Sequence, residues 1–221
     1  MGKNYSFINN QLFTRLIDDK FTTSLIFEKW SKKNWLIKNK EELKKILPKI
    51  KTSKIVIKPL MESGGNGVQI LTKKEATKKA NVQEIKLVQE FINSSKGVPG
   101  VSTSMHDLRV VMINEKIIYA YIREPQKGSY LANLAQGGSL KIVPNENLPK
   151  TILPIVDFAN TAFASFRPRI FCIDFMFDEN KKPWIVELNS MPGLFFTPEE
   201  KTSMLKMYTE LLRVFKFVLK K

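Results

Sequence analysis

Residues 171–193 read FCIDFMFDENKKPWIVELNSMPG, and this stretch predicts a β-hairpin. Two runs rich in β-branched and aromatic residues, 171–177 and 183–188, flank the polar segment DENKK. Runs of this length with a short polar connection are typical of paired antiparallel strands. The hairpin therefore provides a frame on which the positions of its few polar side chains can be predicted.

Three oxygen-bearing side chains stand in this mostly apolar hairpin: Asp174, Glu187 and Asn189. Side chains alternate between the two faces of a strand, so Glu187 and Asn189 lie on the same face. We expect Asp174 to lie opposite Glu187, because a register shifted by one residue would separate Asp174 from the other two. Converging oxygens on rigid strands suit Mg²⁺, which usually also keeps water or substrate phosphates in its shell. The alternative is an ordinary solvated hairpin face.

The composition is that of a folded protein. The chain has 221 residues, of which 43% are hydrophobic, which allows one domain with two lobes and argues against global disorder. No run approaches the ~18 apolar residues needed to span a bilayer. Cys172 is the only cysteine and lies in an apolar run, which excludes a disulfide framework and favours a buried thiol. We expect a cytoplasmic protein without membrane contact.

The charge is strongly basic, with 36 Lys and Arg against 21 Asp and Glu and a net charge of +15. The lysines are spread along the chain, and neither an RNA-binding motif nor zinc-finger spacing accompanies them. We therefore regard nucleic acid as an unlikely partner. The charge predicts a solvated surface together with attraction for anionic ligands, such as a nucleotide or an acidic peptide.

The remaining segments predict an α+β fold with mainly antiparallel sheets. A second hairpin is expected over residues 107–123, and Thr72 with Glu75 forms a capping-box pattern at a helix start. Helices are expected over residues 16–30, 41–47, 72–80, 149–166 and 198–219. The apolar stripe expected to dock the last of these helices on the domain is Met204, Tyr208, Leu211, Phe215 and Val218.

A glycine-rich loop is the second candidate site. The sequence from Lys58 to Val68, KPLMESGGNGV, begins at the end of a predicted strand and leads into another strand. Glycines let backbone N–H groups approach phosphate oxygens, and a lysine adds a point charge. This is not a Walker loop, because no Gly-Lys-Ser/Thr follows and the next element is not a helix. An ordinary glycine turn is the alternative for the loop taken alone.

The order of the motifs is more specific than any one of them. The strings IVIKPLMESGGNGV, LVQEFI, DLRVVMINEKIIYAYIR, NLAQGG and IDFMF…PWIVELNSMPG follow one another along the chain. In this order and spacing they resemble the ATP-grasp superfamily, in particular the branch with glutathione synthetase, ribosomal-protein glutamate ligase and YheC/YheD-type proteins. The resemblance begins at Asp19-Lys20 and extends to Pro198.

The resemblance implies two α+β lobes with a nucleotide between them. We expect residues 1–18 to be an N-terminal extension, residues 19–90 a lobe with a phosphate flap, and residues 91–221 a lobe with the metal site and a C-terminal helix. Family members usually carry a preceding α/β domain that helps to build the acceptor site. Only 57 residues precede Lys58 here, so we expect a minimal module, a fragment, or a protein that depends on a partner domain.

The resemblance also implies a role for each matching residue. ATP and Mg²⁺ (or Mn²⁺) are the implied cofactors. The implied Mg²⁺ ligands are Asp174, Glu187 and Asn189. The positions implied to hold the γ-phosphate and the reacting carboxylate are Arg109, Arg123 and Asn133. The positions implied to contact the nucleotide are Lys58, Gly64, Gly65, Gly67, Gln89, Glu90, Phe91, Ile92 and Asp107.

The activity implied by the resemblance is ATP-dependent ligation of a carboxylate to an amine through an acyl phosphate, with a peptide or protein as a candidate substrate. Two alternatives remain open at this point. One is a phosphotransferase of the same fold with a hydroxyl acceptor, and the other is a basic binding module without catalysis.

Overall fold

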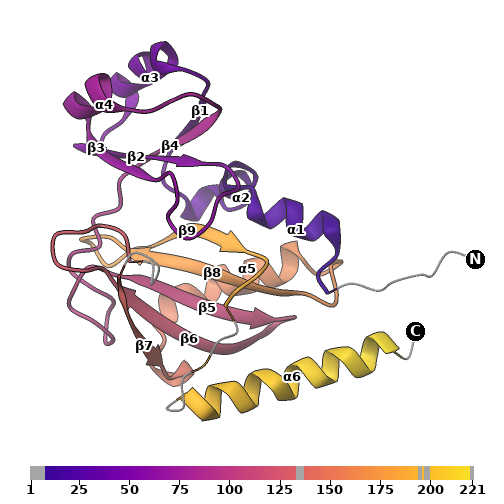
Figure 1. The fold of residues 1–221 in the computed structure, drawn as a ribbon. Coiled ribbons are helices and arrows are strands. Elements are labelled where there is room, and N and C mark those ends of the chain that lie inside the picture. Colours follow the sequence, from indigo (N-terminus) through magenta and orange to yellow (C-terminus); the bar gives the residue numbers. More distant parts are fainter. Residues whose placement is uncertain (1–7, 133–136, 194–195, 197–199, 220–221) are drawn as a thin grey trace, which may run out of the picture.

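The computed structural model describes residues 8–132, 137–193, 196 and 200–219. These residues form two lobes, each built on one antiparallel sheet (Figure 1). The predicted α+β architecture is therefore confirmed.

The smaller lobe is a four-stranded sheet with two helices on one face. Its strands lie in the order β1 (Asn34–Ile37), β4 (Lys86–Glu90), β2 (Lys54–Pro59) and β3 (Gln69–Thr72). The helices are α3 (Lys40–Ile46) and α4 (Lys73–Lys79), which bury Leu43 and Ala76 against the sheet. The predicted capping box is present, because Thr72 and Glu75 each bond to the other's backbone N–H.

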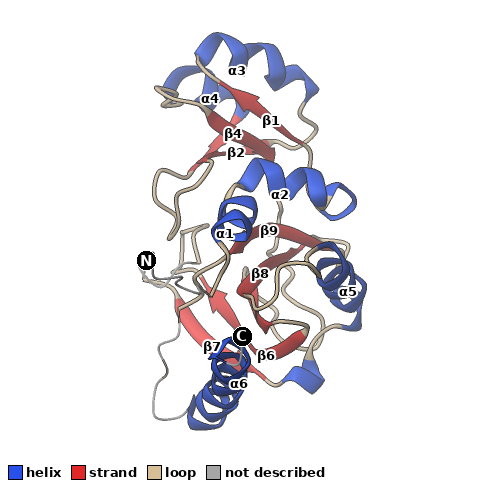
Figure 2. Ribbon diagram, turned by 90° about the vertical axis from the view of Figure 1, so that its right-hand side faces the viewer, coloured by secondary structure: helices blue, strands red, loops and turns tan. Residues whose placement is uncertain are grey.

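The larger lobe is a five-stranded sheet between two layers of helices (Figure 2). Its strands lie in the order β7 (Ser139–Val143), β6 (Lys116–Glu124), β5 (Asp107–Ile113), β8 (Ile170–Phe177) and β9 (Pro183–Asn189). Helices α1 (Gln11–Asp18) and α5 (Leu153–Ala162) cover one face, and α6 (Lys201–Leu219) lies on the other. Short 3₁₀ turns lie at Glu28–Trp30, Leu47–Lys49, Asn145–Asn147 and Lys150–Ile152.

The single helix expected over residues 16–30 is in fact two helices. Asp19 has extended backbone angles, and its side chain caps α2 (Lys20–Ile26) by accepting a hydrogen bond from Thr22 N at 2.6 Å. Because a capping aspartate stabilises a helix start, the chain turns at this residue. The turn places α2 at the junction of the lobes, between β1 and β9 (Figure 2).

The expected lobe boundary at residue 19 also differs from the packing. Phe13, Ile17 and Phe27 are fully buried in the core of the larger lobe. Residues 11–27 therefore pack with the C-terminal lobe, although they precede the smaller lobe in sequence. The compact part of the smaller lobe begins near β1.

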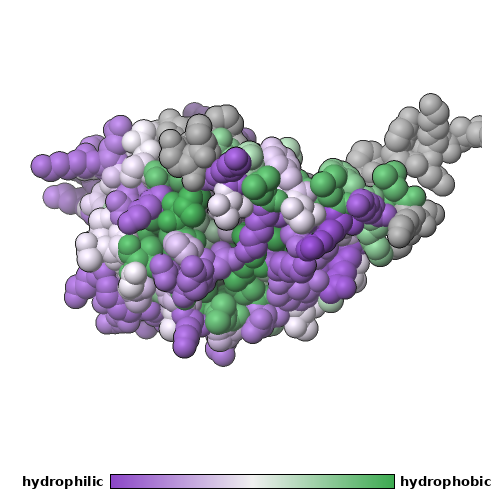
Figure 3. Space-filling model, turned by 90° about the horizontal axis from the view of Figure 1, so that it is seen from below, coloured by the Kyte–Doolittle hydropathy of each residue, from purple (hydrophilic) through white to green (hydrophobic). Residues whose placement is uncertain are grey.

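Helix α6 docks with a stripe that only partly matches the expected one: Leu211 is buried as expected, and Met204 and Val218 are partly buried. Met207, Leu211 and Val214 are its buried residues, whereas Tyr208 and Phe215 are about half exposed, at 48% and 49%. Large hydrophobic residues, among them Leu205, Leu212 and Phe217, also lie on the exposed side of the helix, so periodicity alone does not identify the docking side. The lower face of the molecule accordingly shows hydrophobic residues among the charged ones (Figure 3).

None of the helices in the described ranges is both long and apolar enough to cross a bilayer. This includes α6, whose 19 residues carry several charges.

Candidate active site

The β8–β9 hairpin has the predicted register. Asp174 pairs with Glu187, and Cys172 pairs with Asn189. A bulge follows, because Phe175 pairs with Ile185 and leaves Val186 as an extra residue on β9. The bulged carbonyl of Val186 accepts a hydrogen bond from Lys58 Nζ at 3.0 Å, which links the two lobes.

Two arginines and two aspartates form a buried chain of charges on the face of the large sheet that carries this site. Arg109 Nε donates to Asp174 Oδ1 at 2.6 Å, and Arg109 Nη2 donates to Asp174 Oδ2. Arg123 Nη2 donates to Asp174 Oδ2 at 3.0 Å and also to Asp107. All four side chains are at most 8% exposed. The sequence-predicted site residues of β5, β6 and β8 are thus brought together.

The two aspartates differ in their electrostatics. Burial alone would raise the pKa of Asp174, but Arg109 and Arg123 outweigh it and hold the pKa below its ordinary value. For Asp107, burial dominates and raises the pKa, against the opposing pull of Arg123. Asp107 Oδ1 and Arg123 Nε are also buried without a hydrogen-bond partner among the described residues. Unsatisfied buried groups of this kind are characteristic of sites that complete their bonding with a ligand.

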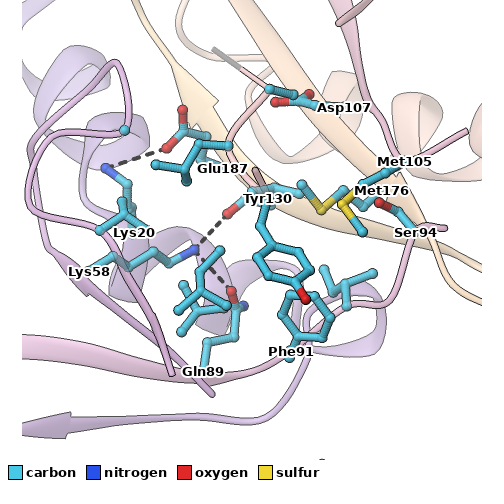
Figure 4. Close-up of a pocket in the computed structure, with 18 of the residues that line it drawn as sticks. Lys20, Lys58, Gln89, Phe91, Ser94, Met105, Asp107, Tyr130, Met176 and Glu187 are labelled. Carbon is cyan, nitrogen blue, oxygen red and sulfur yellow. Dashed lines mark hydrogen bonds and ion pairs between the residues drawn. The ribbon is translucent and has the colours of Figure 1, made fainter. Parts of the chain in front are cut away.

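A cavity between the lobes lies next to this network (Figure 4). Its polar end is formed by Lys20, Lys58 and Glu187, and its apolar end by Phe91, Met105 and Met176. Tyr130 lies over the middle of the cavity and forms an edge-to-face pair with Phe91 at 5.5 Å between ring centroids. An apolar slot with charges at one end is suited to a ligand with a flat ring and an anionic tail.

Lys58 is the most enclosed cation of the cavity. Its Nζ donates to Gln89 Oε1 at 2.9 Å as well as to the bulged carbonyl. Burial lowers the pKa of Lys58 to about 8, with Glu187 opposing the shift and Lys20 adding to it. The ammonium group of Lys58 is therefore fixed in position, and a pKa of about 8 means that it loses its proton only a little above neutral pH.

Lys20 is the main site residue that the motif analysis missed. Its backbone N–H donates to Leu60 O at 3.1 Å, and its Nζ donates to Glu62 O and lies 3.5 Å from Glu187 Oε2 (Figure 4). Helix α2 is thereby fixed to the glycine-rich loop. The sequence contains one signal for this residue, because the resemblance to the ATP-grasp superfamily begins at Asp19-Lys20.

The glycine-rich loop, residues 60–68, adopts a turn that requires glycine. Gly64, Gly65 and Gly67 all have positive φ angles, between 68° and 79°. A Cβ at Gly67 would also lie 2.9 Å from Pro59 Cγ. Of the three glycines, Gly65 lines the cavity. The loop is placed where it can cover the polar end of the cavity.

The four consecutive residues expected to contact the nucleotide at the end of β4, residues 89–92, do not all face the cavity. Gln89, Phe91 and Ile92 line it, whereas Glu90 points to the other side of the strand. There Glu90 Oε1 accepts a hydrogen bond from Lys51 N at 2.8 Å. The expected contact between the Glu90 side chain and a nucleotide is therefore corrected, because neighbouring residues of a strand face opposite ways.

The oxygen donors fit a Mg²⁺ that is held together with substrate phosphates. Glu187 lies at the cavity, and Asn189 Oδ1 accepts a hydrogen bond from Met191 N at 2.7 Å. Both oxygens of Asp174 are bonded to arginines, so metal ligation by Asp174 requires one arginine to move. Among the described residues no three His, Cys, Asp or Glu side chains form a closed ligand group. Mg²⁺ sites with one or two protein carboxylates and several phosphate or water oxygens are common. Asn133 lies outside the described residues.

Comparison with known proteins shows similarity to ATP-grasp proteins. The model of the RimK-like ATP-grasp domain matches residues 18–215. A probable alpha-L-glutamate ligase of Chromohalobacter salexigens is 28% identical over 166 residues, covering 70% of this chain and 48% of that protein. One of Legionella pneumophila is 31% identical over 149 residues, covering 63% and 43%. The chain thus spans about half the length of the curated relatives it matches.

Solved structures show the same fold at low sequence identity. A Chryseobacterium gregarium RiPP-associated ATP-grasp ligase, in complex with ADP and a leader and core peptide, superposes with a TM-score of 0.60 at 13% identity. It covers 92% of this chain and 62% of its own. D-alanine–D-alanine ligase from Bacillus anthracis gives a TM-score of 0.60 at 15% identity, covering 94% and 71%. With the lobes, the cavity and the family match in agreement, this chain belongs to the RimK-like ATP-grasp family.

Proposed function

We propose that this chain is the catalytic module of an ATP- and Mg²⁺-dependent carboxylate–amine ligase that forms an amide bond through an acyl phosphate. The observation that carries the proposal is the set of cations at the Glu187 end of the cavity. Lys20 and Lys58 line the cavity there, Arg109 lies 4.0 Å from Glu187, and Arg123 lies in the adjacent network, where it shares Asp174 with Arg109. Both named curated relatives are probable glutamate ligases, which supports the same reaction class.

The arrangement of charges suits phosphoryl transfer between two anions. Transfer of the γ-phosphate to a carboxylate brings negative groups together, so positioning and charge neutralisation carry most of the catalysis. Lys58 and Lys20 would contact the phosphates, and the glycine-rich loop would exclude water from the acyl phosphate. Arg109 and Arg123 would hold the transferred group and the carboxylate. Asp174 keeps these arginines side by side in the meantime.

Glu187 and Asn189 would hold the metal. Asp174 would join them if one of its carboxylate oxygens gave up its hydrogen bond to an arginine and bound the metal instead. Bound Mg²⁺ supplies charge neutralisation and orientation of the phosphates. The apolar end of the cavity would take the adenine ring, with the backbone at Phe91 and Ile92 as its hydrogen-bonding edge.

An acidic peptide or protein is the substrate class that we favour, since one structural neighbour is complexed with a peptide and the chain is strongly basic. A partner domain would complete the acceptor side, in line with the greater length of the relatives. We place the reaction in the cytoplasm and assign nucleic acid and membranes no part in it.

The pH dependence of ATP binding should report Lys58. The free protein loses the Lys58 proton as the pH rises above about 8, whereas ATP keeps its charge over this range because phosphate ionisation is complete. Affinity for Mg²⁺-ATP should therefore fall by up to about fivefold between pH 8 and pH 9. Calorimetric titration measures this, with Lys58→Arg as the control that keeps its charge. Equal slopes for the two proteins would remove Lys58 from the phosphate site.

ADP release with pooled amino acids and acidic peptides tests the proposed function itself. The expected result is release that requires both a carboxylate and an amine, with a new amide product found by mass spectrometry. A phosphorylated hydroxyl compound as the product would instead support the phosphotransferase alternative. Binding of ATP without any turnover would support the non-catalytic one.

A further inference from the structure

A second cavity, of about 810 Å³, lies on the outer side of the junction between the lobes. Its wall joins α2 and the following 3₁₀ turn to β1, to the end of β4 and to Trp184 of β9. We refer to this cavity as the junction groove. Glu90 faces it, whereas Gln89 and Phe91 face the cavity between the lobes, which we call the nucleotide cavity after its proposed ligand. The two cavities therefore lie on opposite sides of the same strand end.

The junction groove is strongly basic. Five lysines line it, and they are Lys29, Lys32, Lys33, Lys49 and Lys51. Its two acids are Glu28 and Glu90, and the Glu90 carboxylate is already engaged by the Lys51 N–H. Only Lys32 has a carboxylate partner among the described residues, Asp178 at 3.7 Å. A concave surface with this much uncompensated positive charge attracts and retains anions.

The two tryptophan side chains of the groove argue against nucleic acid as its ligand. Proteins that bind single strands stack bases on open aromatic faces. Here the Trp184 ring is contacted by two ammonium groups, Lys32 Nζ at 4.0 Å and Lys182 Nζ at 4.1 Å from its centroid. Trp35 is partly buried against the core of the smaller lobe. Trp184 therefore orients lysines instead of offering a stacking surface.

The cations are also of the kind that suits carboxylates spaced along a chain. The groove contains no arginine, the side chain that recognises phosphate by paired hydrogen bonds. Lysines on flexible stems attract negative groups without demanding one fixed geometry. Their spread over the wall of the groove matches several charges on an extended ligand better than one small anion.

We propose that the junction groove is a docking site for an acidic, extended peptide segment, separate from the nucleotide cavity. The peptide contacts both lobes, because Lys33 and Lys49 belong to the smaller lobe and Trp184 to the larger one. Its binding does not depend on the ligase reaction, and both cavities can be occupied at once.

Fluorescence anisotropy with a labelled octaglutamate peptide at physiological salt tests this site. The variant Lys33→Glu/Lys49→Glu reverses two charges in the groove. The control Lys74→Glu/Lys78→Glu makes the same change in net charge on the exposed side of α4, outside the groove. We expect the groove variant to bind octaglutamate at least about tenfold more weakly and the control within about twofold of the original chain.

Three results would overturn the proposal: no binding of octaglutamate, equal losses in both variants, or tighter binding of an eight-nucleotide oligothymidylate that the groove variant abolishes. The first result would reject an acidic peptide as the ligand. The second would show that binding depends only on the net charge of the protein, and the third would assign the groove to nucleic acid. The rise in melting temperature caused by Mg²⁺-ATP, measured on the same proteins, reports the nucleotide cavity separately. If Mg²⁺-ATP does not raise the melting temperature of the original chain, the result counts against the proposed function and not against the groove.

Discussion

Replacing Asp174 with alanine is expected to lower the free energy of unfolding by about 3–5 kcal/mol, because it leaves two buried arginines without their shared partner. Asp174 is fully buried and accepts hydrogen bonds from both Arg109 and Arg123. For a chain of this size the melting temperature should fall by about 6–20 °C. Thermal denaturation followed by circular dichroism measures the change.

Glu41→Ala is the matched control for this loss. It also removes one carboxylate from a salt bridge, with Lys44 at 3.0 Å, but the pair is exposed on α3. Exposed pairs contribute little, so the melting temperature should change by no more than about 2 °C. A similar small change for Asp174→Ala would show that the buried network does not stabilise the fold as its geometry indicates.

Replacing Glu187 with alanine is expected to cause a large loss of activity and little loss of stability, unlike the replacement of Asp174. Glu187 is 17% exposed at the cavity, and its cationic neighbour Lys20 keeps its bond to Glu62 O. Because we propose that Glu187 holds the metal, and bound Mg²⁺ would stabilise the charge of the transition state, Mg²⁺-dependent ATP turnover should fall at least about a hundredfold. Steady-state ADP release and thermal denaturation of the same sample measure the two effects.

Glu62→Ala is the control from the same cavity. Its side chain is exposed, and the contact with Lys20 is made by its backbone oxygen, so turnover should change by less than about threefold. Retention of activity in Glu187→Ala, or an equal loss in Glu62→Ala, would contradict the assignment of Glu187.

Features set by local sequence were predictable. Runs of β-branched and aromatic residues around short polar turns predicted both hairpins of the larger lobe, and the two-residue period of a strand predicted the pairing of Asp174 with Glu187. The Thr72 capping box follows from a pattern within four residues. In these cases the determining interactions lie within one strand pair or one helical turn, so that the sequence contains them directly.

Features set by packing between distant segments were not predictable from one sequence. The bonds of Asp174 to Arg109 and Arg123 join three strands, and the role of Lys20 depends on where α2 meets the glycine-rich loop. The docking side of α6 depends on the sheet beneath it, because large hydrophobic side chains such as Tyr208 and Phe215 also lie on its exposed side. The direction of the Glu90 side chain, in contrast, could have been predicted from the sequence. Side chains alternate along a strand, so residues 89–92 could not all face the same cavity.

Trapping of the acyl phosphate by hydroxylamine is a direct test of the proposed ligase reaction. The chain would be incubated with Mg²⁺-ATP, a panel of amino acids and acidic peptides, and hydroxylamine, and the hydroxamate would be measured. We expect a hydroxamate that forms only with ATP and a carboxylate and that is lost in Glu187→Ala. ATP turnover that transfers phosphate to a hydroxyl group without any hydroxamate would contradict it.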